Sequence, residues 1–277
     1  MKLLRDLRRL WAQALAIALV MASGVATLIL GVGAYGSLSS TRAAYYEANR
    51  FGDVFASVTR APRVLGSEIA RIDGVLAVEL RIERLAVLDM PGMAEPGTMM
   101  LLSLPDAGRG ALNQLYLRTG HLPESHTTSE AVVSEGFAKA HDLRPGSRFS
   151  VLMNGQKRSV TVTGIALSPE YIYSLGPGDM MPDDRRFGVA WMPNDSLAAA
   201  YDLEGAFSSV VLKLMPGTSE ARVIEALDAM LARYGGTGAA GRADQLSHAF
   251  LDAELNQLKA MSRVLPPIFM VVAAFLV

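Results

Sequence analysis

The sequence predicts a membrane protein of the α+β class, in which a mixed extracytoplasmic domain lies between an amino-terminal transmembrane helix and the start of a second one. Three observations predict this arrangement. No charged residue occurs from Leu10 to Thr41, strand and helix patterns alternate through the middle of the chain, and the charge-free run after Arg263 continues to Val277. The folded domain is therefore expected to be tethered at both ends.

The composition excludes several classes of protein. The 277 residues are 51% hydrophobic and 19% charged, which excludes intrinsic disorder and leaves enough apolar side chains for a sizeable core. A net charge of −1 offers no general attraction to nucleic acid. Because the chain has no cysteine, disulfides, thiolate metal sites and cysteine nucleophiles are excluded as well.

Residues 1–13 are expected to form a basic amphipathic helix on the cytoplasmic surface. Four basic residues stand against the single acidic residue Asp6, and leucines recur among them at helical spacing. Since basic residues remain on the cytoplasmic side of a membrane, the amino terminus is predicted to be cytoplasmic. Everything after Gly36 is then expected on the outer side.

Residues 14–36 are predicted to form the first transmembrane helix, followed by a stalk over residues 37–50. The stretch Trp11–Gly33 is long enough, at a rise of about 1.5 Å per residue, to cross a hydrocarbon core about 30 Å thick. A cleaved signal peptide is the alternative interpretation. The apolar run exceeds the roughly 7 to 15 residues of such a peptide, and no clear small-x-small cleavage site follows it.

Small residues form one predicted packing face of this helix. Alanine recurs at every fourth position, at Ala14, Ala18, Ala22 and Ala26. Faces of small residues let helix backbones approach closely in lipid, so these four residues are candidates for helix packing. The alternative is that alanine is simply common in apolar helices.

Residues 51–241 are predicted to form the extracytoplasmic α+β domain. Its first part reads as a strand at Asp53–Thr59, a helix from Pro62 to near Gly74, a long or broken strand at Val75–Leu88, and a partner strand at Met99–Leu104. The order is strand, helix, strand, strand, which favours a layer of strands with helices on one face.

A second part contains the strongest turn signal of the chain. A short strand at Ala131–Val133 and a helix at Glu135–His141 precede two strands, Arg148–Met153 and Ser159–Ile165. Asn154-Gly155 lies between the two strands, and this dipeptide between alternating runs predicts a β-hairpin. The following stretch up to Phe187 is rich in Pro, Gly and Asp and is expected to be an ordered surface loop.

The third part repeats the pattern of the first. It reads as a strand at Val189–Met192, a helix at Asp195–Tyr201, a strand at Ser208–Met215 and a helix at Ser219–Tyr234. Thr218 is expected to cap the last helix, and Gly235 to end it.

Residues 242–263 are predicted to form a stalk helix that leads into residues 264–277, the start of a second transmembrane helix. Apolar side chains fall at helical spacing at Leu246, Phe250, Leu251, Leu255, Leu258 and Met261. The apolar run after the Pro266-Pro267 pair is shorter than the roughly 20 residues of a full span. A buried terminal helix is the alternative to a span that is cut short.

The motifs that usually carry chemistry are missing or stand in the wrong context. GVGAYG at Gly31–Gly36 matches the dinucleotide-binding pattern, but it ends a membrane helix rather than opening a βαβ unit. No phosphate-binding loop of the Gly-x-x-x-x-Gly-Lys type occurs, the four histidines have no metal-ligand spacing, and no serine lies in a Gly-x-Ser-x-Gly elbow. We therefore expect no catalytic residues, no cofactor site and no metal site in this chain.

Several segments resemble the FtsX-like or MacB-like permeases of ABC transporters. The likeness lies in WAQALAIALVMASGVATLIL in the first span, in LYLRTGHLPE, EAVVSEGFAKAHDLRPGSRFSV and VTVTGIALSPEYIY in the domain, and in the terminal segment that begins at GRADQLSHAF. The resemblance implies a MacB-type core domain and four or more spans in the whole permease. The later spans expected after Val277 are not in this sequence, so the chain is expected to be the amino-terminal part of such a permease.

The resemblance also implies a function and partners. The permease subunit would couple ATP hydrolysis by a cytoplasmic ABC ATPase to movement of the outer domain, for export or extraction of a substrate. The expected partners are that ATPase, further permease helices or a second permease, a periplasmic adaptor and membrane lipid, at the inner or cell membrane. ATP would be bound by the partner subunit. The alternatives are a membrane-anchored ligand-sensing domain of a signalling receptor and, from a third class, an anchored hydrolase.

Overall fold

The structure of the protein is a computed structural model that describes residues 11–90, 92–105 and 110–275. It divides into two compact units, one within residues 1–45 and 250–277 and the other at residues 46–249. The predicted domain at 51–241 falls inside the second unit. Most of the predicted cytoplasmic helix, residues 1–10, lies outside the described residues.

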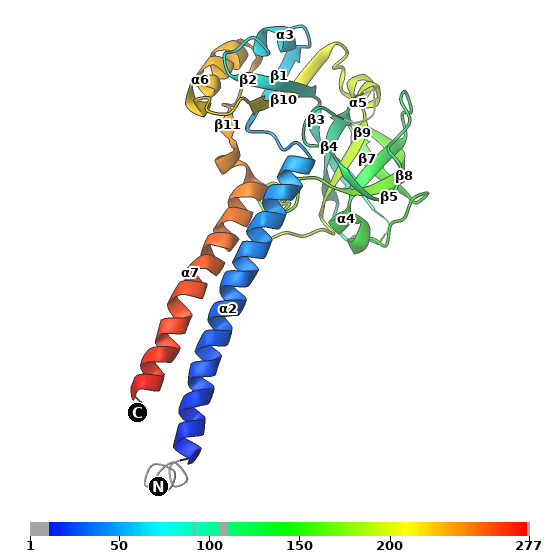
Figure 1. Cartoon of the computed structure of the whole chain (residues 1–277). Helices are drawn as coiled ribbons and strands as arrows, with labels where there is room; N and C mark the ends of the chain where they lie inside the picture. The colour runs from blue at the N-terminus through cyan, green and yellow to red at the C-terminus, as the bar shows by residue number, and fades with distance from the viewer. Residues whose placement is uncertain (1–10, 91, 106–109, 276–277) are drawn as a thin grey trace. The chain divides into compact units, whose positions relative to one another are not determined.

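Two long helices form the first unit. They are α2 (Trp11–Ala48) and α7 (Leu246–Phe275), coloured blue and orange-red in Figure 1. The predicted transmembrane segment 14–36 and most of the predicted stalk 37–50 form one unbroken helix. Pro266 and Pro267 lie inside α7 rather than at its end.

A four-stranded antiparallel sheet forms one part of the second unit. Its order is β11-β1-β10-β2, from the strands β1 (Val54–Pro62), β2 (Val75–Arg81), β10 (Ala206–Leu214) and β11 (Ala240–Gly241). The helices α3 (Leu65–Ile69) and α6 (Glu220–Leu231) lie on one face. The core between them contains Val54, Val210 and Leu212 from the strands and Leu227 from α6.

The opposite face of this sheet carries polar and charged side chains. The strand register aligns Ser57, Ser209 and Arg81 in one row across β1, β10 and β2. Phe55, Val211 and Glu79 form the next row on the same face. Because successive residues of a strand point to opposite faces, this face is set apart from the helix-covered core.

The other part of the second unit is a seven-stranded sheet in the order β5-β8-β6-β9-β4-β3-β7, in which β8 also pairs with β7. That extra pairing closes six of the strands into a barrel and leaves β5 as an addition to β8. The strands are β3 (Glu83–Asp89), β4 (Gly97–Leu104), β5 (Tyr116–Gly120), β6 (Glu130–Ser134), β7 (Arg148–Met153), β8 (Gln156–Leu167) and β9 (Phe187–Pro193). The helices α4 (Glu135–Ala140) and α5 (Asn194–Tyr201) accompany the barrel.

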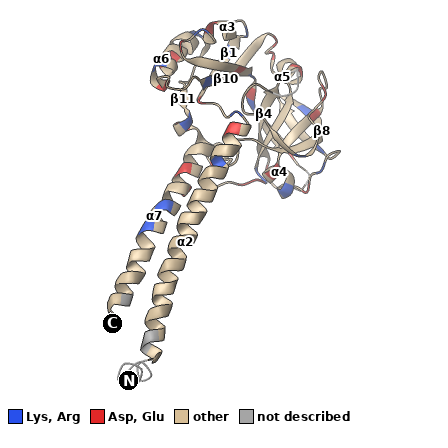
Figure 2. Cartoon of the chain, viewed as in Figure 1, with Lys and Arg blue, Asp and Glu red and all other residues tan. Residues whose placement is uncertain are grey.

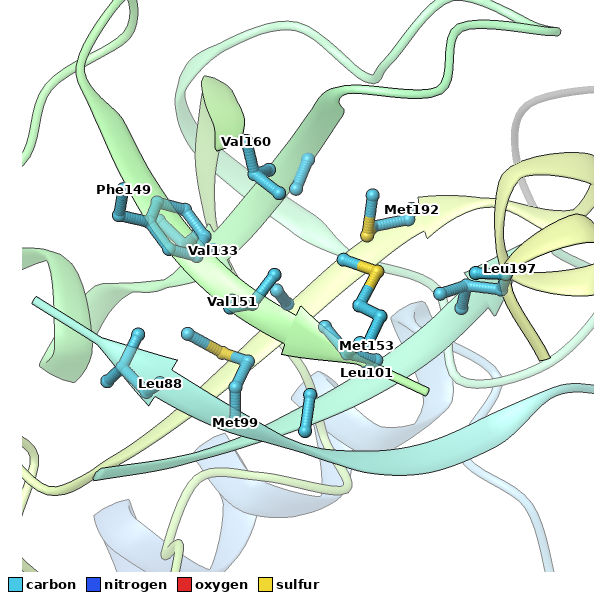
Figure 3. Close-up of a cluster of buried hydrophobic side chains, with 14 of the residues drawn as sticks. Leu88, Met99, Leu101, Val133, Phe149, Val151, Met153, Val160, Met192 and Leu197 are labelled. Atoms are coloured by element: carbon cyan, nitrogen blue, oxygen red, sulfur yellow. The ribbon is translucent and has the colours of Figure 1, made fainter. Parts of the chain in front are cut away.

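Apolar side chains from alternate strand positions fill the barrel. Met99 and Leu101 from β4, Val151 and Met153 from β7, and Met192 from β9 point toward one another (Figure 3) and are at most 1% exposed. The alternating positions of β4, β6 and β9 form a second cluster on the outside of the barrel. This explains why β9 is buried along its whole length.

The α+β class and most of the predicted elements are confirmed. The Asn154-Gly155 hairpin is present, with Met153 opposite Gln156 and both turn residues at positive φ, as a type I′ turn requires. The helix predicted from Pro62 to near Gly74 is shorter, ending at Ile69. Neither β5 nor β11 was predicted.

The long or broken strand predicted at Val75–Leu88 is present and is broken at Ile82. The break arises because Ile82 pairs through its backbone with the backbone and hydroxyl of Ser103. The prediction of the cap of α6 was wrong. The cap position before α6 is Ser219 rather than Thr218. The Thr218 hydroxyl instead donates to the carbonyl of Gly74 at 3.4 Å.

Candidate functional site

The two long helices form an antiparallel hairpin, which we call the helical hairpin (residues 11–45 and 250–275). Four contacts show the antiparallel direction, because the residue numbers rise along α2 as they fall along α7. They are Gly24–Phe269, Gly31–Ser262, Tyr35–Lys259 and Arg42–Asp252. The Lys259 ammonium lies 5.4 Å from the centre of the Tyr35 ring, and the Arg42–Asp252 ion pair is 3.1 Å long. The register of the pair is therefore fixed at four levels.

Glycine permits the close approach of the helices. A Cβ atom at Gly31 would stand 2.7 Å from Cβ of Ser262, and one at Gly24 would stand 3.0 Å from Cβ of Phe269. Distances this short leave no space for a larger residue at Gly31 unless the helices separate. Gly33, two positions further on, has nothing within 4 Å of such an atom.

The predicted alanine face does not form this contact. Ala18, Ala22 and Ala26 are exposed, and the side chain of Ala14 is outside the described ones. Positions four apart drift around a helix by about 40° per step, whereas the contact with α7 alternates steps of three and four. The alanine face therefore remains a prediction for packing against some helix other than α7.

The predicted stalk residues divide into two groups along α7. Leu255 is buried, and Leu251 and Leu258 are half-buried, at the three-four spacing of the contact face. Leu246, Phe250 and Met261 are largely exposed, at 51%, 36% and 48%. The first group holds the hairpin together, and the second leaves apolar surface uncovered in this chain.

The charges of the two helices mark a boundary along the hairpin. Within the described residues, one helix, Leu15–Ala48, is long and apolar enough to cross a membrane by length and composition. The last charged residue of α7 is Arg263, and the contact between Ser262 and Gly31 puts it level with Gly31. Beyond that level both helices are free of charge in their described parts (Figure 2). On the α2 side this leaves Trp11–Leu30, which supplies the roughly 20 residues that a span requires.

A buried ion pair joins the two sheets of the second unit. Arg81 ends β2, and Glu170 lies in the loop after β8; both are 6% exposed. The guanidinium binds the carboxylate through both terminal nitrogens, with 2.6 Å from Nη1 to Oε2, and its Nε donates to the Ser209 hydroxyl at 3.2 Å. Burial by itself would lower the pKa of Arg81, but the charge and hydrogen bonds of Glu170 outweigh it and raise the pKa.

The end of α2 is attached to this pair. The Asn113 side chain donates to Oε2 of Glu170 at 2.8 Å and accepts from the backbone N–H of Gly52 at 2.8 Å. The backbone N–H groups of Asn113 and Gln114 donate to the carbonyls of Arg50 and Asn49, at 3.1 and 2.8 Å. Carbonyls at a helix end lack partners within the helix, so these bonds tie the chain at the end of α2 to Glu170.

The start of α7 is attached to the same residue. The Gln245 side chain donates to the backbone carbonyl of Glu170 at 2.8 Å and accepts from the N–H of His248 at 2.8 Å. Gln245 thereby caps α7, which is why the helix begins at Leu246 and not at the predicted Arg242. The residues Arg81, Asn113, Glu170 and Gln245 form what we call the Glu170 network.

A second cluster fixes the two chain segments to each other. Arg242 donates to the carbonyls of Gly52 at 2.9 Å and Phe51 at 3.1 Å and forms an ion pair with Asp53. Its guanidinium also lies 5.1 Å from the centre of the Phe51 ring. Tyr46 packs against Phe51 at 4.5 Å between ring centres and against His248 at 5.6 Å.

Sequence reasoning missed both clusters. The signal that was available is the strand VLAVELR, in which Glu79 and Arg81 interrupt an otherwise apolar pattern. Charged residues on one face of a strand whose other face is buried indicate a second, polar contact. Their partners in the loops around residues 113 and 170 carry no comparable signal.

Glu79, next to Arg81 on the same face, gives a prediction about pH. Burial raises its pKa above the ordinary 4.5, although the N–H of Leu112, 2.7 Å from Oε2, and the charge of Arg81 act in the other direction. The folded protein therefore keeps the proton to higher pH than the unfolded chain does, and stability falls as pH rises from 4.5 through the raised pKa.

We expect Glu79→Gln to remove this loss, since glutamine keeps an acceptor for Leu112 and carries no charge. The variant should melt at a higher temperature than the native protein at about pH 7, with the difference shrinking toward pH 4.5, where the unfolded carboxyl takes up its proton. Thermal unfolding across this range measures it. The exposed Glu68→Gln is the control, and parallel pH profiles for both variants would contradict the prediction.

The remaining candidates from the sequence lie apart. His121, His126, His141 and His248 each contact a different partner: the carbonyl of Leu122, Asp195, the carbonyl of Arg185 and Tyr46. Apart from the histidines, Asp183 in the loop before β9 accepts from the N–H groups of Arg185 and Arg186 within its own turn. In the described part of the chain, no three side chains of metal-ligating type are grouped.

The comparison with protein families decides which family this fold represents. The family described as the MacB-like periplasmic core domain matches residues 14–230, most of the chain. The chain belongs to this family. Its resemblance to MacB-like ABC transporter permeases is thereby confirmed, and an ATPase partner is general for such permeases. With the apolar α2, the MacB-like family indicates a membrane protein with an extracytoplasmic domain.

Two solved structures of transporter domains are similar to this chain at low identity. The periplasmic region of MacB from Actinobacillus actinomycetemcomitans matches with a TM-score of 0.42 and 11% identity, covering 76% of this chain and 96% of that one. The extracellular domain of the ABC-type transporter YknZ from Gram-positive bacteria matches with a TM-score of 0.41 and 12% identity, covering 69% and 98%. A comparison with curated proteins finds no match.

Proposed function

We propose that the MacB-like chain is the amino-terminal part of a permease subunit that transmits movement. A cytoplasmic ABC ATPase would drive the helical hairpin, and the hairpin would move the extracytoplasmic domain to export or extract a substrate. The amino terminus would be cytoplasmic, ATP would bind to the partner subunit, and the chain would perform no bond chemistry of its own.

One observation carries this proposal: the attachments of both helices converge on Glu170. The end of α2 reaches it through Asn113, and the start of α7 reaches it through Gln245. Because α2 continues without a break from the hairpin into the domain unit, a shift along it acts on these bonds. Glu170 in turn holds Arg81 of the four-stranded sheet, so a movement of either helix would reach both sheets.

The experiment starts with extraction of the protein from its own membrane in mild detergent. We expect an ABC ATPase to co-purify with it, and the rate of ATP hydrolysis to depend on an intact hairpin. Leu255→Asn places an amide on the covered face of α7, whereas Met261→Asn changes an exposed residue of the same helix. Burying an unpaired amide costs about 1–3 kcal/mol, so the first variant should weaken the coupling about tenfold or more and the second only slightly.

The two outcomes against the proposal are distinct. If no ATPase remains associated with the native protein, the permease role fails. If the ATPase remains and both variants stimulate it equally, the hairpin does not transmit movement. If the purified chain alone hydrolyses generic esters or peptides, the result would favour the third class of function, an anchored hydrolase.

A further inference from the structure

A cleft of about 340 Å³ opens between the polar face of the four-stranded sheet and the barrel. Its walls combine polar and charged side chains with aromatic and apolar ones, the latter including Phe55 from β1, Met100 from β4, Phe187 from β9 and Tyr171 from the loop after β8. A volume of this size, with aromatic and apolar side chains beside polar groups that can orient a ligand, is typical of sites for small organic molecules.

The charged groups of the cleft have unequal partners. Three charged side chains line it: Arg81, Glu83 and Glu170. Arg81 and Glu170 bind each other through both terminal nitrogens and both oxygens, so their charges are matched. In the described part of the chain, the closest ion-pair contact of the Glu83 carboxylate is a long one of 3.4 Å to Nη2 of Arg81, and its side chain is 23% exposed. The charge of Arg84 also acts on Glu83, but Arg84 does not line the cleft. The cleft therefore has an excess of one carboxylate.

This combination selects a class of ligand. A carboxylate that is partly withdrawn from water attracts a cation and repels an anion, and aromatic ring faces attract cations as well. Mg²⁺ or Ca²⁺ would need several oxygen ligands, and among the described residues no three side chains of metal-ligating type are grouped. We propose that the cleft binds a small organic cation with an apolar or aromatic body, its positive charge beside Glu83.

The proposal is independent of the permease role, since it concerns binding alone. The cleft also adjoins the Glu170 network, because Gln245 and Leu246 at the start of α7 line it. A bound cation would thus lie against both sheets and against the residue that caps α7.

The chain provides its own reporter for binding. It contains two tryptophans, Trp11 and Trp191, and the Trp191 ring lies edge-on at 6.2 Å from Tyr171, a lining residue of the cleft. In a Trp11→Phe background the full chain in detergent has Trp191 as its single tryptophan. The probe is benzyltrimethylammonium, and benzenesulfonate is the aromatic control of opposite charge.

We expect a saturable change in Trp191 emission with benzyltrimethylammonium and none with benzenesulfonate. Glu83→Gln should weaken binding of the cation about tenfold, since it removes the unmatched charge. The matched control is Glu68→Gln on α3, an exposed residue on the opposite side of the sheet, which should bind as the parent does. Ser57→Phe fills the cleft from an exposed position and should also weaken binding.

Thermal unfolding of each variant shows whether it is folded. If Glu83→Gln does not fold, binding by Ser57→Phe still decides the test. No saturable response to the cation would overturn the proposal. An equal response to both probes, or equal binding by the Glu83→Gln and Glu68→Gln variants, would overturn it as well.

Discussion

Replacing Glu170 by leucine is expected to destabilise the extracytoplasmic domain by about 3–5 kcal/mol, because it leaves the Arg81 guanidinium buried without its counter-charge. Arg81 is 6% exposed, and its other partners are the Ser209 hydroxyl and the distant Glu83 carboxylate. Neither replaces two charged hydrogen bonds. The change also removes the acceptor of Asn113, so the attachment of α2 is weakened at the same time.

The measurement is urea unfolding of the full chain in detergent, followed by tryptophan emission in the Trp11→Phe background. Asp89→Asn is the matched control, because it breaks an exposed ion pair between Asp89 and Lys157. The Lys157 side chain is 63% exposed and the Asp89 side chain 55%. Such a surface pair contributes about 1 kcal/mol or less. A loss for Glu170→Leu no greater than that of the control would contradict the prediction.

A double variant separates the cost of the lone charge from the value of the pair. In Arg81→Met with Glu170→Leu neither charge remains, and replacing a whole buried ion pair by apolar side chains is often close to neutral. We therefore expect the double variant to recover most of the stability that Glu170→Leu loses. It would still lack the link from Asn113 to Glu170. Stability and transmission of movement can thus be measured apart.

Local patterns predicted the elements of this fold better than their long-range pairing. The Asn154-Gly155 hairpin was predictable because the turn residues themselves adopt the required backbone conformation. Closure of the barrel was not, since it requires β8 to pair with β7 along its first half and with β6 and β5 along its second. No local pattern within the twelve residues of β8 indicates that the strand has two sets of partners.

The break at Ile82 shows the same limit at one residue. The alternation of apolar and polar positions continues from β2 into β3, so the sequence predicts one long or broken strand and does not locate the break. Pairing with Ser103, far along the chain, separates the two strands. This break brings Arg81 into the sheet with helices and Glu83 into the barrel, and the cleft lies between them.

The helical hairpin was predicted in outline, and its contact face was not. Spacing identified the stalk leucines Leu251, Leu255 and Leu258, whose covered positions follow from a contact that alternates three and four residues. Recurrence at every fourth position suggested the alanines Ala14, Ala18, Ala22 and Ala26 of α2 as a packing face. The contact uses Gly24 and Gly31 instead, because a seam between two helices depends on position around the helix and not on a repeat of four alone.

Gly31→Leu is expected to separate the helical hairpin, whereas Gly33→Leu is not. A side chain at Gly31 would overlap Ser262, with Cβ atoms 2.7 Å apart, while Gly33 has open space within 4 Å. Forcing extra methylenes into a packed contact costs about 1–3 kcal/mol, which corresponds to a fall of about 5- to 150-fold in the population of the closed pair. The two glycines share a helix and a residue type, so they differ mainly in this contact.

Absence of cysteine from the native chain makes the closed pair measurable by cross-linking. Cysteines introduced at Gly24 and Phe269 would have Cβ atoms 3.0 Å apart, closer than the about 3.5–4.5 Å of a disulfide, so the helices must shift apart slightly there for the bond to form. We expect them to cross-link rapidly in the otherwise native chain and in Gly33→Leu, and about tenfold more slowly in Gly31→Leu. Equal rates in the two leucine variants would show that the helices are not held at Gly31. If the proposed permease role holds, a hairpin opened at Gly31 would also fail to move the domain, even though every bond around Glu170 remains available.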